Sequence, residues 1–93
     1  MRHSIFTEDL TTCYFTGKPN PHVHHVFFGA NRNHAEEDGF IIPLAPELHN
    51  MSDQGVHFNR EFDLVLKRQC QEYYEQNIGT REQFISRYGK SYK

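Results

Sequence analysis

Apolar side chains follow two kinds of pattern along the chain. Residues 22–28 and 40–44 are short runs rich in valine, isoleucine and phenylalanine, which is typical of β-strands. Between residues 57 and 76 the apolar side chains instead recur at every third or fourth position, the spacing of an amphipathic helix. The pattern therefore predicts two short strands followed by one long helix.

Turn-forming residues separate these elements. Residues 16–21 contain a glycine, an asparagine and two prolines, so we expect a loop there, with residues 5–15 before it forming a short strand or hairpin arm. The polar segment 29–39 begins and ends with glycine. It is expected to be a surface loop with one helical turn at residues 34–38.

A second, shorter helix is predicted after the long one. Thr80 is followed three residues later by Gln83, which is the pattern of a capping box, so this helix should cover about residues 80–89. A chain of 93 residues has room for one modest core. We therefore expect a single α+β domain over residues 1–93, with two strands and the long helix as its core at about 22–76.

Composition narrows the classes of function. Ten lysines and arginines against twelve aspartates and glutamates give a net charge of −2, so any nucleic-acid-binding surface must be local. We expect no signal peptide, and the sequence has no run of about 18 apolar residues. We therefore expect a cytoplasmic protein without a membrane partner. It is also too short for a domain that binds an organic cofactor.

Histidine is the over-represented residue type, with seven in the chain. The motif HVHHVFFG places His24 and His25 next to each other on the first predicted strand, where their rings should point to opposite faces. His49 follows the second strand and His57 begins the long helix. Strands closed by a helix could bring His24, His49 and His57 together. Three imidazoles suit a divalent ion with open positions, as in catalytic sites.

These motifs resemble the HNH, or His-Me finger, nucleases, whose ββα-metal core is a β-hairpin and a helix around one divalent ion. In particular, the chain looks like the small HNH proteins common in bacteriophages, through HHVFFGANR, GFIIPLAPELHN, GVHFN and FISRYGKSY. The resemblance implies an endonuclease that hydrolyses phosphodiester bonds in DNA, in the host cytoplasm if it is phage-encoded. It implies that His25 is the general base and that one ion of Mg, Mn, Ni or Zn is held by His24, His49 and His57.

The family's structural zinc site is reduced to one residue in this chain. Many relatives carry two CxxC pairs, and only Cys13 stands at a corresponding position here. Because one thiolate cannot hold a structural zinc, we expect none. Residues 13–16 should instead be held by the packing of Tyr14 and Phe15.

The family's middle asparagine, which orients the base, aligns near Phe40 of this chain. Candidates to replace it, or to contact the substrate, come from the preceding loop: Asn31, Arg32, Asn33 and His34. These departures favour an alternative, a catalytically degenerate HNH-fold protein that binds another protein, such as a phage-encoded inhibitor of a host protein. A metal-stabilised DNA-binding module without catalysis is a third hypothesis.

Ordinary structural interpretations compete with a metal site. Adjacent histidines also occur as exposed strand residues, and His49 and His57 fit a turn and the start of a helix. The functional interpretation is favoured because four histidines fall at the junctions of the predicted strands and helix. The remaining histidines are expected to be mostly solvated: His3, His22 and His34.

Overall fold

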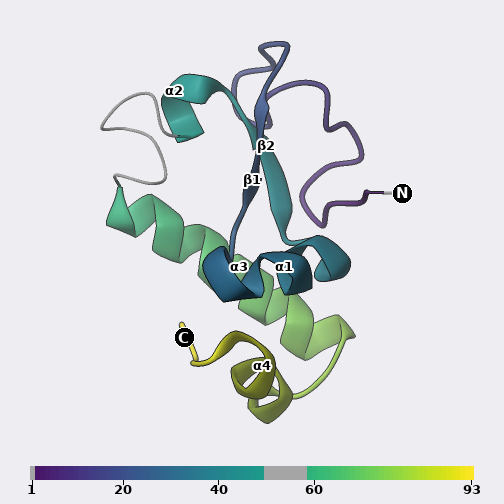
Figure 1. Ribbon diagram of the computed structural model, residues 1–93, viewed down its shortest axis with the longest axis vertical. Coiled ribbons are helices and arrows are strands. Elements are labelled where there is room, and N and C mark those ends of the chain that lie inside the picture. The colour runs from purple at the N-terminus through teal and green to yellow at the C-terminus, as the bar shows by residue number, and fades with distance from the viewer. Residues whose placement is uncertain (1, 50–58) are drawn as a thin grey trace.

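The computed structural model describes residues 2–49 and 59–93. In chain order, its elements are β1 (His22–His25), a 3₁₀ helix (Gly29–Asn31), α1 (Arg32–Asp38), β2 (Ile41–Leu44), α2 (Pro46–His49), α3 (Arg60–Asn77) and α4 (Arg81–Tyr88) (Figure 1). This part of the chain is a small α+β structure, as the sequence predicts. None of its helices has the length and apolar character needed to cross a membrane.

The two strands pair antiparallel, with His22 opposite Leu44 and His25 opposite Ile41. The first strand is shorter than predicted, because regular pairing ends at His25. The next residue, Val26, still donates its N–H to the carbonyl of Phe40 at 2.9 Å, and its side chain is fully buried. In the apolar run beyond residue 25, Val26 and Phe27 are buried in the core, whereas Phe28 is 50% exposed.

The segment predicted as a surface loop with one helical turn at residues 34–38 forms a longer helix, α1, of seven residues. Its only buried residue is Ala35, so the apolar signal was too weak to predict a helix of this length. Gly39 ends it with a positive φ of 79°. A side chain there would also meet the ring of His3, since an added Cβ would lie 2.7 Å from it.

The prediction of a short strand or hairpin arm at residues 5–15 was wrong. Among the described residues, the only bridge that this segment forms joins Thr12 and Pro19. The segment also runs beside β2 through single hydrogen bonds. One of these joins the N–H of Tyr14 to the carbonyl of Pro43 at 2.9 Å.

Residues 13–16 are held by more than aromatic packing. The rings of Tyr14 and Phe15 do make edge contacts, the latter with Phe62 at 5.6 Å between centroids, but they are 47% and 52% exposed. Cys13 is buried. Its burial alone would raise the pKa of the thiol, but hydrogen bonds from Thr16 and from backbone amides lower this pKa below its ordinary value. Buried sulfur and backbone bonds thus fix this turn.

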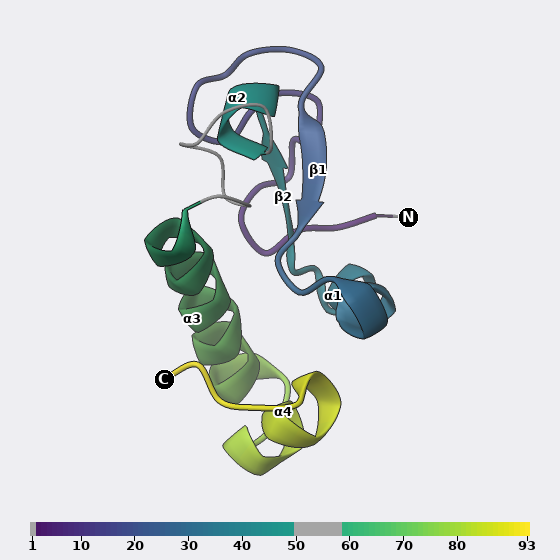
Figure 2. The same cartoon turned by 60° about the vertical axis from the view of Figure 1, so that its left-hand side comes forward.

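The core lies between the strand pair and the C-terminal helices and is largely aromatic. The ring of Tyr88 lies 4.4 Å from that of Phe27 and 4.9 Å from that of Phe84, between centroids. Phe84, Tyr88 and Cys70 are buried, as predicted. The predicted core residue Phe58 lies outside the described residues. In Figures 1 and 2, α2 and α4 lie at opposite ends of α3.

The two C-terminal helices, α3 and α4, each begin with a side-chain cap. The side chain of Asn59 accepts from the N–H of Phe62 at 3.0 Å and starts α3 at Arg60, whereas residue 57, the predicted start, lies outside the described residues. The capping box of Thr80 and Gln83 is present at α4. The prediction of this short helix is confirmed.

Asp38, the last residue of α1, ties that helix to α4. Its carboxylate accepts from Nε of Arg87 at 2.8 Å and from the hydroxyl of Tyr88 at 2.6 Å. Burial, followed by this bond to Asp38, raises the pKa of Tyr88. Since the Asp38 side chain is only 13% exposed, these charge-assisted bonds are shielded from water and fix the position of α1.

We expect Asp38→Asn to lower the free energy of unfolding by about 2 kcal/mol, because it weakens charged hydrogen bonds in a nearly buried place. Urea unfolding followed by circular dichroism measures the change. The matched control is Glu37→Gln, whose side chain is 65% exposed and forms only a 3.6 Å ion pair with Arg87, so its effect should stay within about 0.5 kcal/mol. Equal effects of the two variants would contradict the assigned role of Asp38.

Candidate functional site

Two of the predicted metal ligands line one cavity. His24 comes from β1 and His49 is the last residue of α2, and their ring centroids lie 5.1 Å apart. The short helix α2 follows β2 almost directly, which returns the chain to the side of β1. The cavity has a volume of about 330 Å³ and is lined by Val23, His24, His25, Phe28, Gly29, Arg32 and His49.

His22 belongs to the same histidine cluster, although the sequence predicted a solvated side chain. Its Nδ1 lies 3.0 Å from Nδ1 of His49, and the ring centroids are 5.2 Å apart. One of the two nitrogens must donate and the other accept, so the tautomers of these rings are linked. Side chains two positions apart on a strand share a face, and this rule could have placed His22 beside His24 from the sequence.

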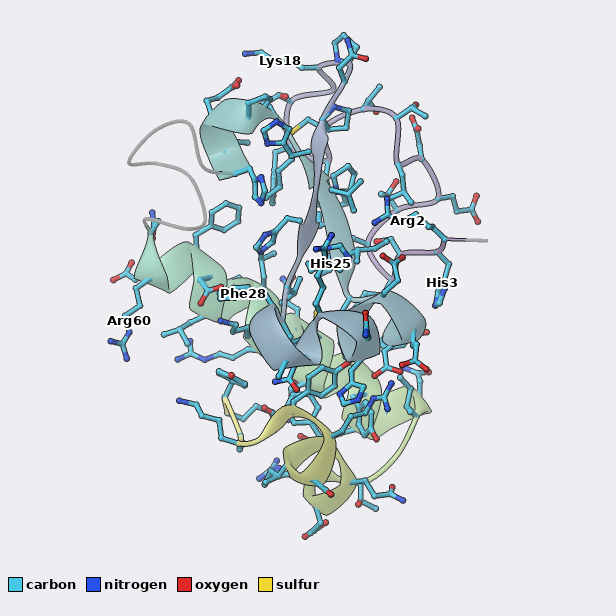
Figure 3. The ribbon with its side chains drawn as sticks, viewed as in Figure 1. Arg2, His3, Lys18, His25, Phe28 and Arg60 are labelled. Atoms are coloured by element: carbon cyan, nitrogen blue, oxygen red, sulfur yellow. The ribbon has the colours of Figure 1, made fainter. Side chains whose placement is uncertain are left out.

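His25 is directed toward α1 and the N-terminal segment, and it also lines the cavity. Its Nε2 lies 2.9 Å from Oε1 of Glu36, a residue of α1. The ring is only 8% exposed. Because a carboxylate only accepts hydrogen bonds, Nε2 must carry the proton. His25 and the neighbouring Arg2 are labelled in Figure 3.

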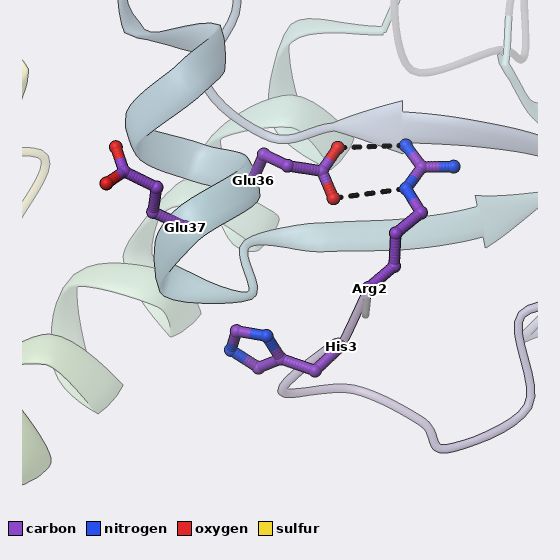
Figure 4. A pocket seen from close by; sticks show the side chains of 4 residues that line it. All are labelled: Arg2, His3, Glu36 and Glu37. Carbon is purple, nitrogen blue, oxygen red and sulfur yellow. Dashed lines mark hydrogen bonds and ion pairs between the residues drawn. The ribbon is translucent and has the colours of Figure 1, made fainter.

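Glu36 is itself clamped by Arg2. Nε and Nη2 of Arg2 donate to the two carboxylate oxygens at 3.0 and 2.9 Å (Figure 4). The hydrogen bonds from Arg2 and His25 lower the pKa of Glu36 to about 2. The N-terminal segment brings Arg2 here, since the N–H of Ile5 donates to the carbonyl of Gly39 at 2.9 Å. Sequence reasoning missed both Arg2 and Glu36.

Three of the four residues predicted to orient the base or contact the substrate do not line the cavity: Asn31, Asn33 and His34. Asn31 Nδ2 donates to the carbonyl of Tyr88 at 3.1 Å, and His34 Nδ1 contacts the carbonyl of Arg87 at 3.2 Å. Both side chains thus bind carbonyls at the end of α4, where a helix leaves acceptors unpaired. Asn33 is exposed. Arg32 is exposed too, but it lines the cavity with the histidines.

The cavity supplies two of the three imidazole ligands predicted for a divalent ion, those of His24 and His49. Imidazole nitrogens are preferred by zinc, nickel and related ions, and two such ligands would leave positions open for water and substrate. Within residues 2–49 and 59–93, no three histidine, cysteine, aspartate or glutamate side chains are grouped so that they could hold a metal ion. The third predicted ligand, His57, lies outside those residues.

The clamp on Glu36 predicts a pH dependence of stability. Its pKa falls from an ordinary value of 4.5 to about 2 in the folded protein, so the folded state favours the ionised carboxylate. This stabilisation is complete above pH 4.5 and is lost as the pH falls to about 2. The difference in free energy of unfolding between the wild type and Glu36→Gln should therefore shrink over that range, measured by urea unfolding. A difference independent of pH would contradict the clamp.

Comparison of the chain with protein-family models, with curated proteins and with solved structures gives no match. The functional argument therefore depends on the geometry of the cavity and on the motifs of the sequence.

Proposed function

We propose that this chain is an HNH-type endonuclease with a ββα-metal fold, which hydrolyses phosphodiester bonds in DNA. The observation that carries the proposal is the placement of His24, His25 and His49 around one cavity. His49 follows His25 by 24 positions and His24 by 25 positions, and the pairing of β1 with β2 brings their elements together. Cutting a phosphodiester needs a base for water and a cation for the developing charge, and this cavity offers residues for both.

His25 is the proposed general base. A neutral imidazole takes a proton from water readily, and a fixed ring makes that transfer efficient. The nearly buried ring of His25 is held on one side by Glu36, at 2.9 Å from Nε2. Nδ1 is then the nitrogen available to accept the proton.

His24 and His49 are the proposed metal ligands, with His57 as the third. A divalent ion supplies Lewis acidity toward the phosphate and neutralises the charge of the leaving oxygen. The 3.0 Å contact with His22 restrains the ring of His49, in the way that outer-shell hydrogen bonds orient metal-binding imidazoles. His22 thus supports the ligand rather than standing apart in solvent.

Arg32 is the proposed phosphate contact. It is exposed and lines the cavity beside the histidines, so its guanidinium can bind a phosphate by two parallel hydrogen bonds. A cation at the site allows DNA to bind even though the net charge of the chain is −2. DNA is attracted by the charge near the site rather than by the sum over the chain.

Substitution of the base tests the reaction. We expect His25→Ala to lower metal-dependent plasmid cleavage at least about 100-fold, since general-base catalysis contributes about 10²–10⁴-fold. Agarose gels of supercoiled plasmid with Mg, Mn, Ni or Zn measure the rate. His3→Ala is the matched control, because His3 does not line the histidine cavity, and it should cleave like the wild type. Equal rates for His25→Ala and the wild type would refute the role of His25.

Substitution of the ligands tests the metal site separately. We expect His24→Ala and His49→Ala each to weaken Ni²⁺ or Zn²⁺ binding by more than about 10-fold, a loss seen even for outer-shell residues of metal sites. His25→Ala should bind these ions like the wild type, since His25 is not a proposed ligand. Isothermal titration calorimetry measures the affinity. If both variants bound the ions like the wild type, His24 and His49 would not be metal ligands.

A second candidate function is a catalytically degenerate HNH-fold protein that binds another protein. It is favoured by an apolar groove lined by Phe6, Tyr14, Phe15, Ile42, Phe62, Val65, Leu66 and Gln69. Three of these side chains are about half exposed, and exposed apolar surface of this kind marks binding sites. A folded wild-type protein that leaves DNA intact with all four metals would favour this candidate over the nuclease.

A further inference from the structure

We propose that Glu36, clamped by Arg2, is a positioning residue that fixes the ring of His25 with its proton on Nε2 and with Nδ1 as the basic atom. The inference rests on the proposed nuclease function and deepens it. It assigns the orientation of the base to a carboxylate of α1, whereas the sequence motifs point to a loop asparagine.

A hydrogen bond joins the ring of His25 to the carboxylate of Glu36. Nε2 of His25 and Oε1 of Glu36 are 2.9 Å apart, a normal distance for a charge-assisted bond. Of the two partners only the imidazole has a proton to donate, because the carboxylate is ionised. A neutral imidazole carries one proton, so the bond to Glu36 selects one tautomer and leaves the lone pair on Nδ1.

The carboxylate of Glu36 is held rigidly. Arg2 donates to both of its oxygens, at 3.0 and 2.9 Å, which is the two-point geometry that restricts rotation of a carboxylate. Oε1 of Glu36 accepts from both Arg2 and His25. The orientation of the His25 ring is thereby coupled to a guanidinium from the N-terminal segment.

Other contacts support Glu36 and Arg2. α1 is tied to α4 through Asp38, whose carboxylate binds Arg87 and Tyr88. The segment that carries Arg2 is tied to the start of β2, because the hydroxyl of Ser4 donates to the carbonyl of Ile41 at 2.5 Å. Glu36 is therefore held through α4, and Arg2 through β2, which pairs with the strand that carries His25. A precise catalytic site requires such support.

The kinetic test compares Glu36→Ala with Glu37→Ala, the neighbouring carboxylate whose side chain is 65% exposed. For Glu36→Ala we expect kcat for plasmid cleavage to fall about 10- to 100-fold, with KM and Ni²⁺ affinity changed by less than about 2-fold. Glu37→Ala should match the wild type. Glu36→Gln, which keeps an oxygen acceptor of the same reach, should lose less than Glu36→Ala. A fall in metal affinity equal to the fall in kcat would overturn the positioning role.

The spectroscopic test needs no activity. Two-dimensional ¹H–¹⁵N NMR of imidazole nitrogens, at a pH about two units above the ordinary imidazole pKa, reports which nitrogen carries the proton. In the wild type we expect His25 in a single tautomer, with a slowly exchanging proton on Nε2. In Glu36→Ala this proton should exchange rapidly and its signal should disappear, while Glu37→Ala leaves it unchanged.

Two results of the NMR comparison would overturn the inference: a proton on Nδ1 of His25 in the wild type, or an unchanged His25 signal in Glu36→Ala. Thermal unfolding of each variant separates these results from loss of the fold, and Glu36→Gln serves if Glu36→Ala is unfolded. A wild type that cuts no DNA with any metal would reject the proposed function. The His25 signal would still decide whether Glu36 fixes the ring.

Discussion

The alternation of side chains along β1 is the constraint on which the candidate site depends. In a strand, neighbouring side chains face opposite ways, so His24 lies beside His49 while His25 meets Glu36. The pairing with β2 fixes this arrangement, and it separates the residues proposed to hold a metal from the residue proposed to take a proton.

The sequence predicts the elements whose apolar pattern is strong. The two strands, the long helix and the capped C-terminal helix were all visible, because each has a clear period or cap. For α1 the sequence predicts only one helical turn at residues 34–38, since its only buried residue is Ala35 and its position depends on the bonds of Asp38 to a distant helix. Its length could not be predicted from local composition.

The candidate site was predictable in its histidines but not in their partners. His24 and His49 share a cavity, and His22 could have been added from its position on the same strand face. Glu36 and Arg2 are 34 residues apart, and Glu36 meets His25 only after α1 has formed and docked. No spacing rule connects such residues, so their contact comes from tertiary structure alone. The position expected to hold an asparagine, Phe40, is instead buried in the aromatic core.

The central claim is that His24 and His49 hold one divalent ion in the cavity beside His25. Crystals grown or soaked with Zn²⁺, measured at the zinc absorption edge, test it most directly. The account predicts an anomalous peak about 2.1 Å from one ring nitrogen of each of these two histidines, with at least one position filled by water. A protein saturated with Zn²⁺ but without a peak in this cavity would contradict it.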